Sequence, residues 1–446
     1  MYRLSFLLGL VVALGWEMSS FAQSAMEWTL EESVRIALKK SKAVAMAEEK
    51  LRESRAKIGE ARAGFLPQIG GKASYTRLDV VPYISMEKFS IPGMPAEALP
   101  GKIEMGDDDL YNVVVSTQQP LFTGFKILNG YRMAEYGAEA EGWNYRKTES
   151  EVIFNVEEAY YGVLKAQEFE KVSERAVAQM EAHVRDLENM YQVGMIAKND
   201  LLKAKVQRSN VKLMRIQATN AVKMAKAAFC SVLGIPLDTE VELKAKLEYE
   251  PSPPVVLDEA IQKALKERPE VEAMQYMLKI GQKAVSLSKA QWLPNVALIG
   301  NYNYKRPNRE YEKKWYGSWD VTVAAQMNVF DWGSIYYQTA QAKHRLRQME
   351  EGFGQLKDGI ALEVTQSYLA LQEAQEKVGA TQENVAQAEE NYRVTNEKFK
   401  QGMATNTDLL DANTMLTQAE MEYVQALADH HVAEAKLEKA MGVSVR

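Results

Sequence analysis

The sequence is poor in the residues that build chemical sites. It has a single cysteine, Cys230, among 446 residues, so one chain can form neither a disulfide nor a cysteine-based metal site. Its histidines are His183, His344, His430 and His431, and none of them stands in an H-E-x-x-H spacing. No histidine, cysteine or paired acid has the spacing of a catalytic group in either half of the chain. The sequence therefore predicts a protein that is not an enzyme and that carries no cofactor and no metal.

Two of the histidines are adjacent. His430 and His431 follow Asp429 directly, and side chains of these types bind metal ions. A solvated helix face is the more common setting for such a group, and we expect one here.

The chain also lacks an excess of positive charge and long apolar runs. It carries 54 Lys and Arg against 60 Asp and Glu, a net charge of −6 and a pI of about 5.6. A mildly acidic chain has no electrostatic footprint for nucleic acid, so that class of partner is excluded. Beyond residue 22 there is no run of roughly 18 apolar residues, and we therefore expect no transmembrane helix.

The N-terminus has the pattern of a targeting sequence. Arg3 precedes an apolar run over residues 4–16, and Ser20-Phe21-Ala22 is a small-x-small cleavage pattern. Together they predict a secretory signal peptide over residues 1–22. No cysteine lies near the cleavage pattern, so the sequence gives no lipid-anchor signal. We expect an exported protein.

The sequence contains two similar segments of eleven residues. FLPQIGGKASY spans residues 65–75, and WLPNVALIGNY spans residues 292–302, 227 positions later. After the shared tyrosine, matching segments lie 208 positions apart down to the end of each half. The chain is thus a tandem duplication of about 210 residues. We divide it into a first repeat (23–234), an irregular linker (235–256) and a second repeat (257–446).

The change of offset places extra residues in the first repeat. They fall between Tyr75 and Leu121, in the stretch VPYISMEKFSIPGMPAEALPGKIEMGDDD. This stretch is rich in proline, methionine and acidic residues, and its composition predicts a loop.

Each repeat contains two segments with a hydrophobic period of two. They predict four strands, at about 68–78, 110–120, 295–305 and 319–330. Each strand is preceded or followed by a long stretch with a helical sequence pattern. Their length of about ten residues is typical of a transmembrane β-strand. Four strands of a soluble sandwich are the alternative, but a polar face of Gln, Asn, Ser and Thr in an exported chain favours the membrane. Aromatic residues at the strand ends form the belt expected at a membrane surface: Phe122, Trp292, Trp315, Trp319, Phe330 and Trp332.

Long helices follow the second strand of each repeat. Residues 126–192 and 334–400 are free of proline, and each would run about 100 Å. Return helices are expected at 199–233 and 406–440, roughly 53 Å each. Each return helix is therefore too short to span the full length of the long helix before it. We expect residues 270–290 to extend the first return helix and residues 43–64 the second.

Local signals set the helix ends. Pro67 and Pro294 end the helices that precede them. Thr29 and Glu32 have the spacing of a capping box, and Thr405 has the same spacing with an aspartate, Asp408, in place of the usual glutamate.

Four strands do not close a barrel alone, and an open sheet edge in lipid leaves backbone groups without hydrogen bonds. The chain is therefore expected to oligomerise, with eight strands in a dimer or twelve in a trimer. The helices carry narrow apolar stripes, which suit helices packed side by side around a hollow.

In these features the chain resembles the TolC family of outer-membrane efflux proteins, over essentially the whole mature sequence. The resemblance rests on segments that occur in the same order in both repeats: LEESVRIALKK and LDEAIQKALKE, LPQ and LPN, PLFTG and NVFDWG, VGMIAKNDLL and QGMATNTDLL. It implies an α+β membrane protein that forms a homotrimer. Twelve strands then make a β-barrel in outer-membrane lipid, and the helical hairpins make an α-barrel tunnel in the periplasm.

The resemblance also implies a function. Such proteins are the passive exit ducts of tripartite efflux pumps, and they dock to a periplasmic adaptor (a membrane fusion protein) and an inner-membrane transporter. A duct for type I protein secretion is the alternative within the family. A soluble periplasmic coiled-coil adaptor or scaffold is the alternative from another class, but four duplicated strands and the missing lipid anchor disfavour it. Soft-metal export, suggested by 21 methionines, is weaker, because methionine more often fills gaps between helices.

The family docks its adaptor at the two turns between long and return helices. The residues of this chain that match the family's turn pattern are Val193, Gly194, Met195 and Asp200 in the first repeat and Gly402, Met403, Ala404, Thr405 and Asp408 in the second. The departures are Ala197, Lys198 and Gln401, which bear on adaptor specificity. The glycines would also cap the helices before them.

Asp408 and Asp411 lie three positions apart, on one face of the first turn of a helix. Carboxylates there suit the positive end of the helix dipole. The resemblance implies that, in a trimer, they also form two acidic rings at a cation-sensitive entrance. In the first repeat the matching residues are Asp200 and Lys203, so the second ring would come from the second repeat alone.

Overall fold

The computed structural model describes residues 28–86 and 101–443, and the expected signal peptide lies outside them. The chain forms two compact units. The first, the tip unit, comprises residues up to Ala37, Asn155–Glu250 and Lys377–Val432. The second, the sheet unit, comprises Leu38–Phe154, Pro251–Glu376 and the residues from Ala433 onward. Each unit takes segments from both sequence repeats, so the units and the repeats are different divisions of the chain.

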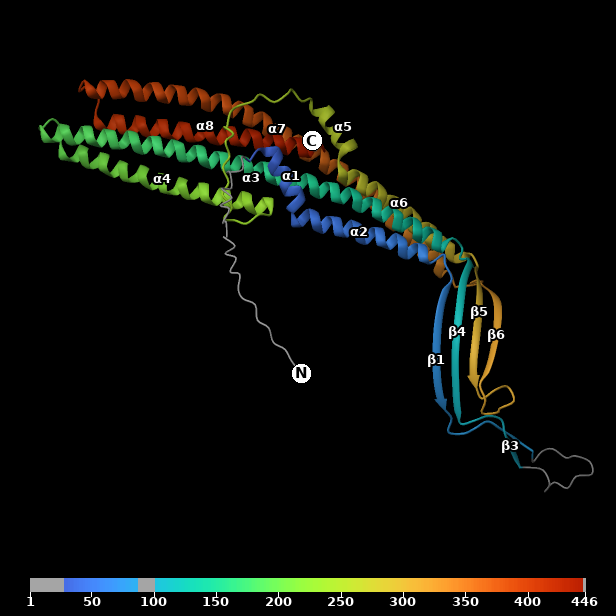
Figure 1. Ribbon diagram of the computed structural model, residues 1–446. Coiled ribbons are helices and arrows are strands. Elements are labelled where there is room, and N and C mark those ends of the chain that lie inside the picture. The colour runs from blue at the N-terminus through green and yellow to red at the C-terminus, as the bar shows by residue number, and fades with distance from the viewer. Residues whose placement is uncertain (1–27, 87–100, 444–446) are drawn as a thin grey trace, which may run out of the picture. The chain divides into compact units, whose positions relative to one another are not determined.

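The sheet unit contains a four-stranded antiparallel sheet in the order β1-β4-β5-β6 (Figure 1). Its strands are β1 (Gln68–Arg77), β4 (Asp109–Phe122), β5 (Asn295–Arg306) and β6 (Tyr316–Gln326). Two strands come from each repeat, as the alternating pattern predicts. Among residues 28–86 and 101–443, neither β1 nor β6 has a partner strand on its outer side.

The register sorts the side chains of this sheet onto two faces. Residues paired across neighbouring strands share a face, and Val115, for example, pairs with Tyr302, which in turn pairs with Trp319. One face collects mainly apolar side chains: Ile69, Ala73, Tyr75, Tyr111, Val113, Val115, Leu298, Tyr302, Tyr304, Trp319, Val321 and Val323. The other face collects mainly polar ones: Gln68, Lys72, Ser74, Asn112, Ser116, Gln118, Asn301, Asn303, Ser318, Asp320 and Thr322.

The fourth strand differs from its predicted range. It spans Tyr316–Gln326, whereas the sequence pattern places it at about 319–330. The reason is its partner: β5 begins at Asn295, directly after Pro294, and the last pair is Asn295 with Gln326. Residues after Gln326 have no ladder partner in this sheet, and Val329 and Phe330 lie outside the strand, exposed. Similarly, β4 extends to Phe122 with a register shift at Pro120, which has no N–H for the ladder.

The predicted loop between β1 and β4 also contains regular structure. Strands β2 (Tyr83–Ser85) and β3 (Lys102–Glu104) pair antiparallel as a separate two-stranded sheet. The prediction of a plain loop is wrong for these residues, because Ile84 and Ile103 lie opposite each other in a short ladder that composition alone does not reveal. The rest of that stretch, residues 87–100, lies outside the described residues.

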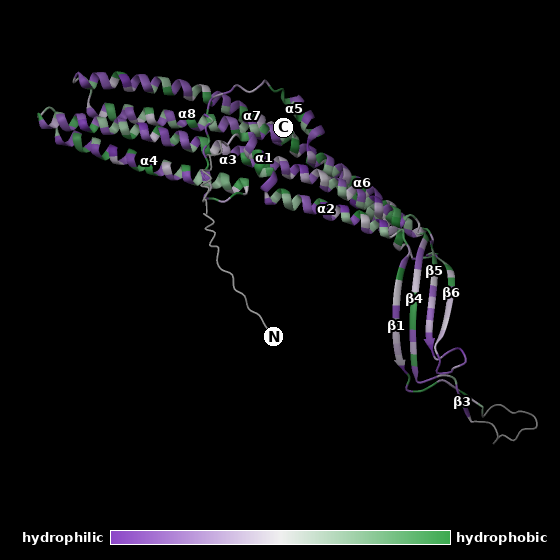
Figure 2. Ribbon diagram, viewed as in Figure 1, coloured by the Kyte–Doolittle hydropathy of each residue, from purple (hydrophilic) through white to green (hydrophobic). Residues whose placement is uncertain are grey.

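The helices lie close to their predicted positions. The long helices α3 (Lys126–Gln192) and α7 (Ser334–Lys400) have 67 residues each. The return helices are α4 (Lys198–Leu233) and α8 (Asn406–Ala440). In each of these four helices hydrophilic and hydrophobic residues are interspersed (Figure 2). Among the described residues, none of the helices has a stretch long and apolar enough to cross a membrane.

Shorter helices precede each pair of strands. They are α1 (Leu30–Lys40) and α2 (Lys42–Ala63) in the first repeat, and α5 (Leu257–Glu267) and α6 (Pro269–Lys289) in the second, followed by the 3-10 turn η2 (Ala290–Trp292). The amide of Glu32 donates to Thr29 Oγ1 at 3.2 Å, which confirms the cap predicted before α1. The matched lengths in the two halves confirm the tandem duplication of an α+β fold.

The expected pairing of short and return helices is wrong. Within the sheet unit, the chain just after α8 reaches the start of α6, because a Cβ built on Gly442 would lie 3.0 Å from the amide nitrogen of Arg268. Within the tip unit, Trp28, just before α1, meets Phe229 near the end of α4 edge-on at 6.3 Å. The second return helix is therefore continued by α6, not by residues 43–64, and the N-terminal segment packs at the end of the first.

The elbows between strand and long helix need left-handed backbone. Gly124 (φ 60°) and Phe125 (φ 67°) turn β4 into α3, and Trp332 (φ 56°) and Gly333 (φ 83°) turn the chain from β6 into α7. A Cβ on Gly124 would lie 2.7 Å from the carbonyl oxygen of Ala290, so this elbow also needs the close approach of two backbones.

Candidate docking site at the hairpin tips

Both hairpins of the tip unit end in the same backbone turn. The first tip (residues 193–197) joins α3 to α4, and the second tip (residues 401–405) joins α7 to α8 (Figure 1). Gly194 has φ 77° and Gly402 has φ 73°. A Cβ on either glycine would meet nothing within 4 Å, so the left-handed backbone, not crowding, requires glycine here.

Hydrogen bonds complete each turn in the same way. The amides of Gly194 and Met195 donate to the carbonyls of Tyr191 (3.0 Å) and Met190 (2.8 Å). At the second tip, Gly402 and Met403 donate to Phe399 (3.0 Å) and Lys398 (2.8 Å). This pair of bonds satisfies the last carbonyls of a helix and reverses the chain. The glycines therefore have the capping role that the sequence predicts.

The turns present apolar side chains to solvent. Val193 and Met195 are 70% and 73% exposed at the first tip, and Met403 is 66% exposed at the second. Beneath them the hairpin has an apolar core, which includes Met180, Val184 and Leu187 of α3. The exposed residues add nothing to this core, so they are free to contact another protein.

The two tips differ in how their return helices begin. Thr405 and Asp408 cap α8 in both directions: the Asp408 amide donates to Thr405 Oγ1 at 3.2 Å, and the Thr405 amide donates to Asp408 Oδ2 at 2.8 Å. This is the predicted capping box, and it is confirmed. At the first tip Ala197 occupies the N-cap position of α4 and makes no side-chain cap.

The acidic residues of the second tip have different surroundings. Hydrogen bonds from the hydroxyl and the amide of Thr405 hold the pKa of the Asp408 carboxyl below its ordinary value. The Asp411 side chain is exposed and borders a groove of about 410 Å³ between α4 and α8, together with Lys203. Asp200 of α4, the counterpart of Asp408, accepts a bond at its main-chain carbonyl. The acidic rings stay a prediction, since they need three chains.

A polar joint between the hairpins escaped the sequence analysis. His183 of α3 lies 2.8 Å (Nε2 to Oδ1) from Asn406, the first residue of α8. Asn406 in turn donates from Nδ2 to the carbonyl of Asp200 in α4 at 3.0 Å. The sequence gives only a weak signal for this joint. Asn406 directly follows the capping Thr405, and His183 lies within a predicted helix.

The adjacent histidines are not on a solvated face, contrary to expectation. His430 is fully buried and meets the ring of Tyr249 edge-on at 5.0 Å. His431 stacks on Tyr161 at 4.5 Å and shares a 2.9 Å hydrogen bond with the carbonyl of Glu248. The linker residues 248 and 249 are held against α8 by these contacts, a tertiary arrangement that the local sequence does not indicate.

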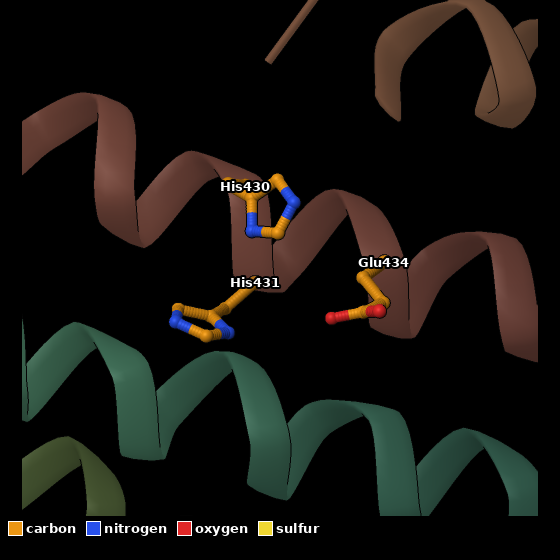
Figure 3. Close-up of side chains that lie close together, drawn as sticks. All are labelled: His430, His431 and Glu434. Atoms are coloured by element: carbon orange, nitrogen blue, oxygen red, sulfur yellow. The ribbon is translucent and has the colours of Figure 1, made fainter. Parts of the chain in front are cut away.

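Figure 3 shows His430 and His431 with Glu434 on α8. Their candidate ligand atoms lie within 4.8 Å of one another. However, the ring stacking and the bond to Glu248 give His431 a packing role, and His430 packs against Tyr249. Asp429, the neighbour considered in the sequence, pairs instead with Lys377 at 3.5 Å.

Comparisons with known proteins agree with this architecture. The family model described as "Outer membrane efflux protein" matches residues 34–235 and 260–443. The alkaline protease secretion protein AprF of Pseudomonas aeruginosa is 24% identical over 344 residues, which cover 76% of this chain and 70% of that protein. The outer membrane efflux protein BepC of Brucella suis is 23% identical over 330 residues, covering 74% and 72% of the two chains.

Solved structures share the fold. The outer membrane channel CmeC of Campylobacter jejuni superposes with a TM-score of 0.75 at 17% identity, covering 99% of this chain and 94% of that one. The outer membrane protein VceC of Vibrio cholerae gives a TM-score of 0.73 at 17% identity, covering 93% and 96%. The resemblance to the TolC family and the α+β fold are thereby confirmed. The chain belongs to the family of outer membrane efflux proteins, and it is an exit channel of the outer membrane with a helical part in the periplasm.

Proposed function

We propose that this chain is the passive, homotrimeric exit duct of a tripartite pump, docked through its hairpin tips to a periplasmic adaptor and an inner-membrane transporter. The observation that carries the proposal is the sheet. It has one apolar face and one polar face, and no strand in the described part of the chain pairs with the outer side of β1 or of β6. Three copies joined edge to edge give twelve strands, with the apolar face toward lipid and the polar face toward an aqueous lumen.

The helices support the same assembly. One side of α4 carries large apolar residues of which at least half of each side chain is exposed: Leu202, Val206, Leu213, Ile216 and Met224. Most are spaced three, four or seven residues apart, so they form a stripe along the helix. A stripe of this kind, unpartnered in one chain, is suited to packing against a helix of the neighbouring copy.

The tips are the proposed docking surface. Val193, Met195 and Met403 expose apolar groups on turns whose backbone is fixed by two hydrogen bonds each. A rigid apolar projection loses little entropy on binding, which favours a protein partner at this place. The other residues of the proposed surface shape the tips: Gly194, Gly402 and Ala404 lie in the turns, Thr405 and Asp408 cap α8, and Asp200 lies in the first turn of α4.

Asp411 is the better candidate for an acidic ring at the entrance. The Asp408 carboxylate is engaged by Thr405, whereas the Asp411 side chain is exposed. In a trimer Asp411 supplies three carboxylates at one level. We therefore expect Asp411→Asn to lower the cation selectivity of the channel in planar bilayers more than Asp408→Asn does. Equal selectivity in both variants and in the unchanged protein would remove the ring.

A type I secretion duct is a second candidate, and the similarity to a protease secretion protein is the observation that favours it. Both functions need the same trimer and the same docking tips. They differ in the cargo, which the partner transporter selects.

The test begins with the native mass of detergent-extracted protein from separated membranes. We expect three chains in the outer-membrane fraction, and a monomer would overturn the proposal. The second step compares Met195→Asp with Met403→Asp, as a double variant, against the control Met46→Asp, which alters an equally exposed methionine on α2. In a strain whose own gene is deleted, the double variant is expected to form trimers but to leave ethidium inside the cells. Full ethidium export by the double variant would contradict docking at the tips.

A further inference from the structure

Two histidines and a glutamate of α8 form a compact group of side chains that are able to bind a metal ion. The segment HHVAE places His430 four positions and His431 three positions before Glu434. Residues at these spacings are neighbours on the surface of a helix. One candidate ligand atom of each residue lies within 4.8 Å of the others, and Figure 3 shows the Glu434 carboxylate extending toward the two imidazoles. The helix itself therefore assembles the group.

A hydrogen bond decides which nitrogen of His431 is able to bind a metal ion. Its Nε2 lies 2.9 Å from the main-chain carbonyl oxygen of Glu248. A carbonyl oxygen only accepts, so Nε2 carries the hydrogen, and Nδ1 of the neutral ring keeps its lone pair. Metal-binding histidines usually donate their other ring N–H to a carbonyl or a carboxylate in the same way. The bond to Glu248 therefore prepares Nδ1 as a ligand.

The packing of the two rings is compatible with metal binding. His431 stacks face to face on Tyr161 at 4.5 Å, with an angle of 2° between the rings, and His430 meets Tyr249 edge-on at 5.0 Å. A metal ion bonds to an imidazole nitrogen in the plane of the ring, so stacking on the face of His431 does not compete with it. Because the stack also holds this ring in one orientation, less entropy is lost when an ion binds.

The Glu434 carboxylate supplies the negative charge of the group. Its side chain is partly buried, and within the residues that the structure describes it makes neither an ion pair nor a hydrogen bond. A partly buried carboxylate without such a partner carries a desolvation cost, and a bound cation offsets it. The charge state of the group thus favours a cation beside Glu434.

The ligand types indicate the class of metal. Two imidazole nitrogens and one carboxylate oxygen suit zinc and related transition metals, whereas Mg²⁺ and Ca²⁺ prefer oxygen ligands alone. Bonds from zinc to these atoms are about 2.0–2.2 Å long, so the three atoms need shifts of less than about 1 Å to share one ion. His430 is fully buried, but His431 and Glu434 are partly exposed. A water molecule is therefore able to fill the fourth position.

We propose that His430, His431 and Glu434 bind one divalent transition-metal ion of the zinc type, and that the bound ion holds the linker (235–256) against α8. The connection to the linker is the bond from His431 to the carbonyl of Glu248, because a ring fixed by a metal ion at Nδ1 cannot turn away from that carbonyl. This site differs from the sequence-based expectation, which placed the histidines on a solvated helix face. It also goes beyond the duct function, since it concerns neither the tips nor the sheet.

The experiment titrates Zn²⁺ into purified full-length protein without an affinity tag, after metal has been removed with a chelator. Isothermal titration calorimetry should give one ion per chain. Glu434→Gln keeps the size of the side chain but removes its charge, and it should weaken Zn²⁺ binding by about tenfold or more. His431→Gln removes the Nδ1 ligand and should have an effect of the same direction. The matched control is His344→Gln, which alters an exposed histidine of α7 and should bind Zn²⁺ as the unchanged protein does.

Amide hydrogen exchange tests the second part of the proposal. Saturating Zn²⁺ should increase the protection of the linker peptide that contains Glu248 and Tyr249. The increase should occur in the unchanged protein and in His344→Gln but not in Glu434→Gln. Circular dichroism checks that each variant keeps its helices, and Glu434→Gln is expected to do so because its side chain is partly exposed.

The outcomes that would overturn the proposal are specific. The metal site is excluded if the unchanged protein does not bind Zn²⁺, if Glu434→Gln and His431→Gln bind it equally well, or if Mg²⁺ at the same concentration displaces it. Zn²⁺ binding without added protection of the linker would overturn the effect on the linker. Neither readout requires a trimer or a partner protein, so a failure here leaves the duct function unaffected.

Discussion

Thr405 and Asp408 cap each other at the second tip, and their counterparts at the first tip do not. Thr405 uses its hydroxyl and its amide in bonds to Asp408 Oδ2, at 2.7 and 2.8 Å, and accepts a bond from the Asp408 amide. Ala197 has no hydroxyl with which to do the same, although its backbone is extended (φ −76°, ψ 148°), as an N-cap requires. The two tips therefore share a turn but differ in the stability of the helix that follows.

This difference predicts the effect of restoring the cap. Ala197→Thr, with Asp200 already three residues on, should stabilise the start of α4 by about 1 kcal/mol, and Thr405→Ala should destabilise the start of α8 by a similar amount. Amide hydrogen exchange over the first turns of α4 and α8 measures both changes. Ala197→Val is the matched control, because it adds the same branch without the hydroxyl. Equal protection in the Thr and Val variants would contradict the cap.

The second prediction concerns acid. Bonds from Thr405 lower the pKa of Asp408 from its ordinary 3.8. A carboxyl with a depressed pKa stabilises the folded cap above pH 3.8, and this contribution is lost as the pH falls through the lowered value. The protection of the amides at the start of α8, relative to their intrinsic exchange rates, should therefore fall in strong acid but stay constant between pH 5 and pH 7. Asp408→Asn should abolish the acid dependence. An unchanged dependence in that variant would assign it to another group.

The third prediction concerns the elbow after β4. Gly124→Ala places a Cβ 2.7 Å from the carbonyl oxygen of Ala290 and 2.8 Å from Leu293 Cβ, at φ 60°. We expect a loss of about 1–3 kcal/mol in unfolding free energy, because left-handed backbone and contact with main chain both oppose the change. Thermal unfolding of the purified protein measures it. Gly130→Ala in α3, where a Cβ would meet nothing within 4 Å, should be neutral or stabilising. Equal melting temperatures would refute the close approach.

The fourth prediction concerns the apolar stripe of α4. Leu213→Asp places a charge in the middle of this stripe, where Leu213 is 55% exposed in one chain. If a neighbouring copy covers the stripe, burying the charge should block or strongly weaken trimer formation while the single chain stays folded. Native mass in detergent and circular dichroism test the two parts. Leu213→Met keeps an apolar side chain of similar volume and should assemble normally. A fully trimeric Leu213→Asp protein would place the stripe elsewhere than at an interface.

Local sequence signals determine much of the fold. Pro67 and Pro294 stop helices before β1 and β5. Gly194 and Gly402 end the two long helices. Alternation along the strands predicts the two faces of the sheet. Each of these signals acts on the backbone of its own segment, through a missing N–H, a left-handed turn or a side-chain period. The sequence by itself therefore determined the elements, the duplication and the family resemblance.

The tertiary structure decided what depends on segments far apart in the chain. It ended β6 at Gln326, because β5 offers no partner beyond Asn295. It buried His430 against the linker and joined His183 to Asn406, residues more than 200 positions apart. It also placed the end of α8, not α4, at the start of α6. These outcomes follow from which surfaces pack in three dimensions, and a hydrophobic period or a capping motif states only that a face will be covered, not which segment covers it.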